Sequence, residues 1–332
     1  MTVRRPIRLI KRSEMANNFT MSEAIDWMAF AFAKLSSGDS YVPKRYIFNT
    51  KDDTLNLLLK PAFINEQNTS SIKILTQKQS TLIPGIPTIL GIVLLIDTVT
   101  GEILSIMDGE FITALRTGAA SGLATKYLSR KDASKLAIFG CGSQGKTQLE
   151  AVNTVRNLEK IWVFDKFQET AQNFIDEMSC KTKAEVEFTD DLSILKNVDI
   201  ICTATNSKSP LFYKEHLKNG VHINAIGSYK PNMQELDPEI INSALSYFDD
   251  KKACICETGD FLRAIETPGF TEKNIIGEIG ECVLGKTEGR KSSEDITIFK
   301  SVGTAIQDLV VADRIFSKSL KKDFGQEIRL YE

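Results

Sequence analysis

A glycine-rich turn between an apolar run and a helical pattern is the feature that most constrains the fold of this chain. In KLAIFGCGSQGKTQLEAV, residues 135–152, four apolar residues precede Gly140, Gly142 and Gly145. A Gly-x-Gly-x-x-Gly turn after a strand and before a helix is typical of a dinucleotide-binding βαβ unit. The first glycine allows the tight turn, the second lets the backbone approach a pyrophosphate at the helix N-terminus, and the third lets helix and strand pack.

An acidic residue stands where the second strand of such a unit would end. Asp165 follows the apolar residues 161–164, and a carboxylate there accepts hydrogen bonds from the adenosine ribose hydroxyls. Because it repels a 2′-phosphate, we expect NAD(H) rather than NADP(H), although the adjacent Lys166 weakens that preference. Ser143 and Gln144, at the helix start, complete this part of the expected cofactor site. The alternative is a similar turn that binds no phosphate, with Asp165 as an ordinary solvated residue.

Strand-like and helix-like segments alternate through the middle of the chain. Expected strands cover residues 135–139, 160–164, 185–188, 198–203, 221–226 and 296–299, and expected helices cover 143–157, 168–178 and 302–316. This alternation predicts an α/β fold with a Rossmann-type, doubly wound parallel sheet. The carboxyl ends of such strands face the cofactor, and the residues expected there are Thr203, Ala204, Thr205, Ile226 and Gly227. Either threonine taken alone could instead serve only to cap or turn the chain.

The first third of the chain has a different pattern. Residues 20–23 have the form of a capping box, apolar residues follow at helical spacing through Phe32, and Gly38 is a plausible stop. Strand-like stretches then cover residues 45–48, 54–60, 71–76, 91–97 and 102–107, with a hairpin loop at 97–101. A long helix, rich in small residues, is expected over 111–128. We therefore expect an α+β domain with a mostly antiparallel sheet.

Charge and hydropathy exclude several classes of partner. The 332 residues suffice for two domains with sizeable cores, and the net charge of −2 without long Lys/Arg runs lacks the footprint of a nucleic-acid binder. A basic cluster near the N-terminus, expected to be a solvated edge, comprises Arg4, Arg5, Arg8, Lys11 and Arg12. The longest apolar run, residues 89–96, is too short to span a bilayer, and the N-terminus lacks the apolar core of a signal peptide. We expect a small-molecule partner, not nucleic acid or a membrane.

Cysteine and histidine usage bears on metals and compartment. The six cysteines show no Cys-x-x-Cys spacing and only two histidines exist, so we expect no metal site. We interpret the thiols as reduced core residues of a cytoplasmic protein. Cys254 and Cys256 alternate as same-face residues of a strand would.

Three motifs together resemble a known family. They are residues 107–121 (MDGEFITALRTGAAS), 140–144 (GCGSQ) and 299–303 (FKSVG), and in this order they resemble the ornithine cyclodeaminase/mu-crystallin family over about residues 45–308. The resemblance implies a homodimer whose strands pair across the interface. It also implies a substrate-binding and dimerisation domain of residues 1–115 with 305–332, and a Rossmann domain of residues 116–304. Members act on amino or imino acids at the carbon that bears nitrogen.

The resemblance assigns a carboxylate-binding set and part of the nicotinamide site. Arg45, Lys73 and Arg116 match the family's three ligands for the substrate α-carboxylate, and arginine grips a carboxylate with two parallel donors. Lys73 lies in an otherwise apolar strand, where a charged side chain needs a partner. The backbone at Ser301 and Val302 can approach the nicotinamide ring. Asp308, farther along the last helix, has the features of an ordinary surface acid and is not assigned to the site.

One position departs from the cyclodeaminase pattern. Cyclodeaminases place an aspartate that works on the substrate nitrogen shortly after a strand like residues 224–227, and here Tyr229 stands at that position. A tyrosine with its reference pKa of about 10 is a poor base at neutral pH, although it can donate a proton. Lys73 is then the better candidate for proton transfer, with Tyr229 assisting. Tyr229 is equally compatible with a loop aromatic that lies over the pocket.

These observations favour an NAD(H)-dependent oxidoreductase that moves hydride at the α-carbon of an amino or imino acid. It would be an amino acid dehydrogenase or a ketimine reductase. The first alternative is a redox-neutral ornithine cyclodeaminase that forms proline and ammonia. The second is a non-catalytic small-ligand binding protein on the same scaffold, against which the presence of a complete carboxylate-binding set argues.

Overall fold

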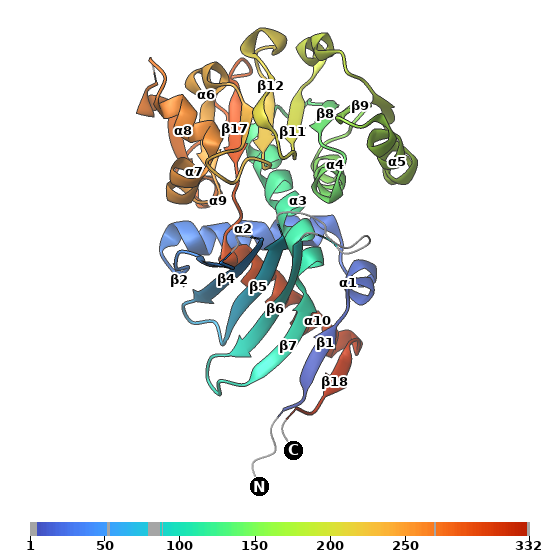
Figure 1. The fold of residues 1–332 in the computed structure, drawn as a ribbon, viewed down its shortest axis with the longest axis vertical. Helices are drawn as coiled ribbons and strands as arrows, with labels where there is room; N and C mark the ends of the chain where they lie inside the picture. Colours follow the sequence, from blue (N-terminus) through green and yellow to red (C-terminus); the bar gives the residue numbers. More distant parts are fainter. Residues whose placement is uncertain (1–4, 52–53, 79–86, 88, 269, 331–332) are drawn as a thin grey trace. The chain divides into compact units, whose positions relative to one another are not determined.

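The computed structural model describes residues 5–51, 54–78, 87, 89–268 and 270–330 (Figure 1). The chain divides into two compact units. The terminal unit comprises residues 1–116 and 304–332, and the central unit comprises residues 117–303. The chain passes from the first to the second within helix α3 (Gly109–Leu128), and it returns just before helix α10 (Ala305–Lys322).

The central unit is built on an eight-stranded sheet in which every pair is parallel. The strand order is β10-β9-β8-β11-β13-β17-β15-β16. The strands are β8 (Lys135–Phe139), β9 (Lys160–Phe164), β10 (Glu185–Phe188), β11 (Ile200–Thr203), β13 (His222–Ala225), β15 (Leu245–Phe248), β16 (Ile275–Glu278) and β17 (Thr297–Lys300). A separate parallel pair is formed by β12 (Lys208–Phe212) and β14 (Gln234–Leu236).

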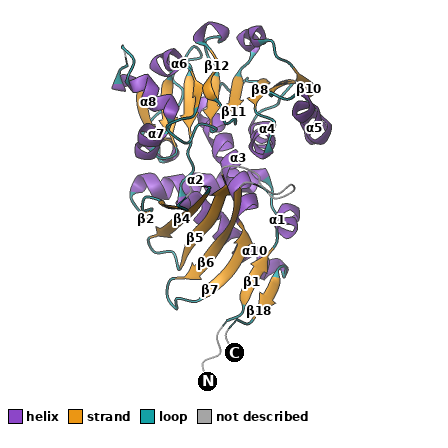
Figure 2. Ribbon diagram, viewed as in Figure 1, coloured by secondary structure: helices purple, strands orange, loops and turns teal. Residues whose placement is uncertain are grey.

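Both faces of this sheet are covered by helices (Figure 2). Alternate residues of β8 enter different cores: Leu136 packs with α4 and α5, whereas Ala137 packs with α6 and α8. The helices are α4 (Ser143–Val155), α5 (Gln168–Met178), α6 (Pro238–Ser243), α7 (Lys251–Glu257), α8 (Gly259–Ile265) and α9 (Ile279–Val283). A parallel sheet buried on both sides is the doubly wound α/β architecture, so the predicted fold class is confirmed.

One local prediction in this unit is wrong. Cys254 and Cys256 lie in helix α7 and not in a strand. The Asp250 side chain accepts a hydrogen bond from the backbone N–H of Ala253 at 2.9 Å, which caps the helix N-terminus. Because residues two apart in a helix point in different directions, Cys254 is buried and Cys256 is exposed.

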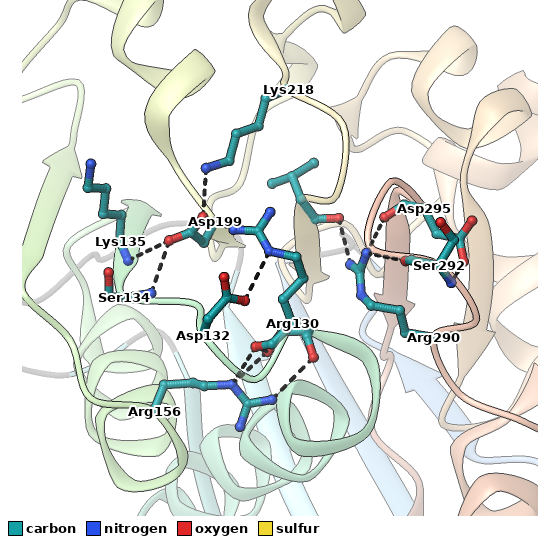
Figure 3. A network of polar contacts seen from close by, with 12 residues as sticks. Arg130, Asp132, Ser134, Lys135, Arg156, Asp199, Lys218, Arg290, Ser292 and Asp295 are labelled. Carbon is teal, nitrogen blue, oxygen red and sulfur yellow. Dashed lines mark hydrogen bonds and ion pairs between the residues drawn. The ribbon is translucent and has the colours of Figure 1, made fainter.

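A polar network fixes the amino ends of β8 and β11 (Figure 3). Asp199 accepts hydrogen bonds from Arg130 at 2.7 Å and Lys218 at 2.6 Å, and from the backbone N–H groups of Ser134 and Lys135 at the start of β8. Arg156 donates to backbone carbonyls at the end of α3, including those of Thr125 and Ser129. These hydrogen bonds satisfy polar groups at the amino ends of the strands, whereas the glycine-rich turn follows the carboxyl end of β8, so their role is structural.

The terminal unit contains a mostly antiparallel sheet with the order β18-β1-β7-β6-β5-β4-β2, and β3 also pairs with β4. Its strands are β1 (Ile7–Ile10), β2 (Ser40–Tyr41), β3 (Tyr46–Asn49), β4 (Leu55–Ile64), β5 (Thr69–Lys78), β6 (Ile89–Asp97), β7 (Ile103–Asp108) and β18 (Gln326–Ile328). Helix α10 packs on β4, β5 and β6, and also against α2 (Met21–Ser37). The expected, mostly antiparallel sheet and its hairpin at residues 97–101 are confirmed.

Capping signals located α2 correctly, but the chain ends hold elements that the sequence patterns did not reveal. Thr20 accepts a hydrogen bond from the Glu23 backbone, and Gly38 ends α2 with a φ of 82°. The short helix α1 (Arg12–Asn18) and strands β1 and β18 were not expected. They are short, and β1 and β18 pair only because the two ends of the chain meet.

The expected solvated edge at the N-terminus is wrong for Arg8. Its guanidinium is buried, donates to the backbone carbonyls of Ser319 and Phe324, and pairs with Glu327 at 2.6 Å. This arginine therefore joins the two ends of the chain. Arg4, from the same cluster, lies outside the described residues.

Candidate functional site

A buried ion pair lies at the centre of the terminal unit. The Lys73 Nζ on β5 lies 2.7 Å from Asp308 Oδ2 on α10, and it donates to Thr113 Oγ1 at 3.1 Å. The side chains of Lys73 and Asp308 are 1% and 0% exposed. Asp308 stands in the first turn of α10, where the helix dipole favours a negative charge.

Arg116 joins the same centre. Its Nε lies 3.4 Å from Asp308 Oδ1, and a terminal nitrogen donates to Gln307 Oε1 at 3.3 Å. Arg116 is buried, so it is not a helix-surface charge. The expectation that Asp308 is a surface acid is wrong. The available signal was Lys73, a charge in an apolar strand that required a counter-ion.

Arg45 is half-buried in the loop before β3. Its charge, with that of Arg116, contributes to lowering the pKa of Lys73. The three predicted carboxylate ligands thus lie in one unit and within electrostatic reach of one another. A fourth cation, Lys60 on β4, was missed. It stands directly opposite Lys73 in the antiparallel register of β4 and β5.

Burial and crowding of like charges shift the titration of this centre. Burial lowers the pKa of Lys73 to about 8; Arg116 adds to the shift and Asp308 opposes it. Burial alone would raise the pKa of Asp308, but the positive charges of Lys73, Arg116 and Lys60 lower it. Asp308 is therefore an ionised counter-ion, and Lys73 can gain or lose a proton near neutral pH.

The glycine-rich turn of the central unit has the geometry that the sequence predicts. Gly140 has a φ of 97°, and a Cβ there would lie 2.6 Å from the Ala204 carbonyl oxygen. A Cβ on Gly145 would overlap the carbonyl oxygen of Gly140, so helix α4 and β8 require glycine at this contact. At Gly142, the residue before α4, no described atom outside the adjoining residues lies within 4 Å of the Cβ position. That open backbone at a helix N-terminus fits a pyrophosphate.

The residues around this turn are consistent with a dinucleotide. Asp165 follows β9 and accepts backbone N–H groups from Cys141 at 2.9 Å and Phe167 at 3.0 Å. A carboxylate has about four acceptor sites, so capacity for ribose hydroxyls remains. Lys166 and Ser143 are exposed. Gln144 Oε1 is buried without a hydrogen-bond partner among the described residues, as expected of a group that faces a ligand.

A buried carboxylate that the sequence did not reveal organises the ends of β11 and β13. Glu235 accepts the hydroxyls of Thr203 and Thr205, both at 2.7 Å. It also accepts the backbone N–H groups of Thr205, Gly227 and Ser228. The two threonine hydroxyls thus hold the loops that carry Ala204 and Gly227, rather than pointing toward a ligand.

A second buried acid fixes the segment after β17. Asp249 accepts the Ser301 hydroxyl at 2.6 Å and the backbone N–H groups of Val302 and Gly303 at 3.1 and 2.7 Å. This carboxylate was also missed, because its partners lie more than fifty positions away in the sequence. The backbone at Ser301 and Val302 is therefore held in one conformation.

Tyr229 lies half-buried in the loop after β13, and Ile226, three positions earlier, is buried. The Lys230 Nζ lies 5.4 Å from its ring centroid. Tyr229 belongs to the central unit, whereas Lys73 belongs to the terminal unit. This distance lies within the range of a cation–π interaction between the Lys230 ammonium and the ring of Tyr229.

In the part of the chain that the structure describes, no three His, Cys, Asp or Glu side chains gather in a way that could hold a metal ion. Nor does any helix in these described ranges have the length and apolar character that crossing a bilayer requires.

Known proteins match this chain over almost its whole length. The model of the ornithine cyclodeaminase/mu-crystallin family matches residues 8–323. The chain is 35% identical over 322 residues to a Δ1-pyrroline-2-carboxylate reductase of Bacillus cereus, and the match covers 96% of this chain and 99% of that protein. The resemblance found in the three motifs is thereby confirmed.

Two solved structures resemble the whole chain. One is the Thermococcus litoralis Δ1-pyrroline-2-carboxylate reductase in complex with NADH and L-proline, with a TM-score of 0.92, 34% identity, and coverage of 97% of this chain and 100% of that chain. The other is an archaeal alanine dehydrogenase dimer with bound NAD, with a TM-score of 0.90, 30% identity, and coverage of 98% and 99%.

Proposed function

The chain belongs to the ornithine cyclodeaminase/mu-crystallin family, and on this premise we propose that it is an NAD(H)-dependent oxidoreductase acting at the α-carbon of an amino or imino acid. The observation that carries the proposal is the buried centre of Lys73, Asp308 and Arg116. Buried charges are costly unless paired, and among the described residues two buried cations, Lys73 and Arg116, share the buried carboxylate of Asp308. A substrate carboxylate supplies the missing charge.

In this proposal Arg45, Lys73 and Arg116 bind the substrate α-carboxylate. When bound, the nicotinamide supplies hydride to the substrate carbon or takes it up. In the reductive direction the C=N carbon gains the hydride and the nitrogen gains a proton. Lys73 donates that proton, because its pKa of about 8 leaves it protonated yet acidic near neutral pH. Tyr229 assists by hydrogen bonding.

The central unit holds the cofactor in this proposal. The pyrophosphate lies against Gly140, Gly142 and the start of α4, where Ser143 and Gln144 stand. The adenosine ribose bonds to Asp165, whose carboxylate favours NAD(H) over NADP(H), although Lys166 beside it weakens that preference. The loops proposed to contact the rest of the cofactor carry Thr203, Ala204, Thr205, Ile226, Gly227, Ser301 and Val302. The NADH and NAD in the two related structures support this assignment.

Homodimer formation belongs to the same proposal, with the terminal unit binding the substrate and forming the interface. Strands β3, β4 and β6 expose large apolar side chains, among them Tyr46, Ile47, Phe48, Phe63 and Ile92. An exposed apolar face of this kind marks an association surface, and the related alanine dehydrogenase is a dimer. A cytoplasmic location is also proposed, since all six cysteines are free thiols.

The function is tested by a substrate panel with NADH and with NADPH. The assays measure NADH absorbance and released ammonia. The substrates are cyclic imino acids, oxo acids with ammonia, ornithine and, in the oxidative direction, L-amino acids. We expect net NADH oxidation with an imino or oxo acid, and slower oxidation of NADPH because Asp165 repels the 2′-phosphate. Ornithine loss with ammonia release and no net absorbance change would indicate redox-neutral cyclodeamination. Cofactor binding without turnover would indicate a binding protein.

The pH profile gives a separate prediction. Lys73 must be protonated to donate, and its pKa is about 8, so reductive kcat/KM should be flat below that pH and fall as the pH rises through it. Burial sets this pKa first; the positive charges of Arg116 and Arg45 lower it further, and the negative charge of Asp308 opposes the shift. The measurement is kcat/KM from pH 6 to about 10, and the pH dependence of the protonation of the substrate itself is measured in parallel. A rate that rises through this range would contradict the assignment of Lys73 as the acid.

A further inference from the structure

A buried glutamine in the first turn of helix α10 uses only one end of its side-chain amide. Gln307 is 0% exposed, and its Oε1 accepts hydrogen bonds from the Thr304 backbone N–H at 2.8 Å and from a terminal nitrogen of Arg116 at 3.3 Å. Its Nε2 is buried and has no hydrogen-bond partner among the described residues. The carbonyl end of the amide is therefore paired, and the amino end is not.

The two partners fix the orientation of this amide. A backbone N–H and a guanidinium N–H can only donate, so the atom that faces both of them must be the amide oxygen. A flipped amide would place donors against donors. Because Oε1 and Nε2 are bonded to the same carbon, the unpaired donor lies close to the guanidinium of Arg116, in the terminal unit.

The contacts within the protein do not explain why this residue is a glutamine. Glutamate would accept the same two hydrogen bonds, and its charge would suit both Arg116 and the N-terminus of α10. The amide instead adds a buried donor that the described residues leave unpaired, which native structures seldom retain without a partner from outside the chain. A site that must accept an anion does explain the choice, because a second carboxylate next to Asp308 would repel that anion.

We infer that Gln307 is a further substrate-binding residue, whose Nε2 donates a hydrogen bond to the same α-carboxylate that Arg116 binds. The inference rests on the proposed function and deepens it. Of the polar groups at the substrate α-carbon, the carboxylate suits this donor, because its oxygens accept hydrogen bonds, whereas a protonated imine nitrogen donates them. The Oε1 atom meanwhile holds Arg116, so one side chain orients the arginine and contacts the ligand.

Two variants separate the ligand contact from the structural role. Gln307→Glu keeps an oxygen for Thr304 and Arg116 but loses the donor, whereas Gln307→Met loses both. The probes are L-proline, which a related structure contains, and L-alanine, and their binding to the NADH-loaded protein is measured by calorimetry. We expect the dissociation constant of the probe that binds wild type to rise at least about tenfold in both variants, the effect of losing one hydrogen bond to a charged group.

A purely structural role predicts a different pattern, in which Gln307→Glu restores what Gln307→Met loses. Denaturant unfolding measures that role directly. Gln307→Glu should unfold at the same denaturant concentration as wild type, because the cap and the contact with Arg116 persist, and Gln307→Met should unfold at a lower one. The matched control for the added charge is Gln326→Glu on the exposed strand β18, which should bind the probes as wild type does.

The inference is overturned if Gln307→Glu binds the probes as tightly as wild type, which would show that water satisfies the donor. It is also overturned if wild type binds neither probe, or if Gln307→Glu loses binding and stability together. With the best substrate of the panel, the loss should appear mainly in KM, because the carboxylate contact is the same in the ground state and the transition state. If binding depends on Gln307 but no substrate is turned over, the proposed oxidoreductase fails while the carboxylate contact stands.

Discussion

Lys73→Met is expected to lower kcat/KM of the NADH-dependent reaction by at least about 10³-fold. A positioned general acid contributes about 10²–10⁴-fold, and Lys73 is also proposed to hold the substrate carboxylate. Methionine matches the length of the lysine stem without its charge. Asp308 keeps Arg116 as an ion-pair partner in this variant, so the fold should persist. The measurement is steady-state kinetics on the best substrate of the panel.

Cofactor binding is the internal control for this variant. The residues proposed to hold NADH belong to the central unit, whereas Lys73 lies in the terminal unit. The dissociation constant for NADH, measured by fluorescence, should therefore change less than about twofold, within ordinary surface-mutation effects. A variant that keeps wild-type kcat/KM would remove Lys73 from the chemistry. A variant that loses NADH binding as well would indicate a general structural defect.

The parts of the fold that the sequence predicted well are those with local signals. The strand over residues 135–139, its glycines and the following helix are specified within one short stretch. The capping box at Thr20 and the left-handed Gly38 bound α2 in the same way. Each signal depends on backbone geometry that neighbouring residues determine, so it can be interpreted without knowing the tertiary structure.

The parts that were missed depend on pairing between distant segments. Lys73 and Asp308 are 235 positions apart, and no local pattern distinguishes Asp308 from a surface acid. The alternation of β4 places Lys60 on the face of Leu58, but only the register with β5 sets it opposite Lys73. Glu235 is likewise defined by the loops that it joins. Sequence reasoning therefore located the cations better than the carboxylates that organise them.

Asp308→Asn is expected to lower the free energy of unfolding by about 3–5 kcal/mol, the usual cost of removing one partner of a buried ion pair. The substitution preserves shape but leaves Lys73, Arg116 and Lys60 without the carboxylate that faces them. The measurement is denaturant unfolding at pH 7. Asp313→Asn is the matched control on α10, because Asp313 accepts a hydrogen bond from the uncharged hydroxyl of Thr69 and not from a cation. It should cost about 1 kcal/mol.

Two measurements distinguish loss of the counter-ion from a packing defect as the cause of this lower free energy of unfolding. Combining Asp308→Asn with Lys73→Met removes one of the uncompensated cations, so the double variant should lose less stability than the sum of the two single variants. The deficit of Asp308→Asn should also shrink as the pH rises from 7 toward 10. Lys73 can relieve the repulsion by releasing its proton. The free energy needed to deprotonate it falls as the pH approaches about 10.4, the pKa of a lysine in the unfolded chain. A deficit that is additive and independent of pH would show that Asp308 acts through packing and not as the counter-ion of the site.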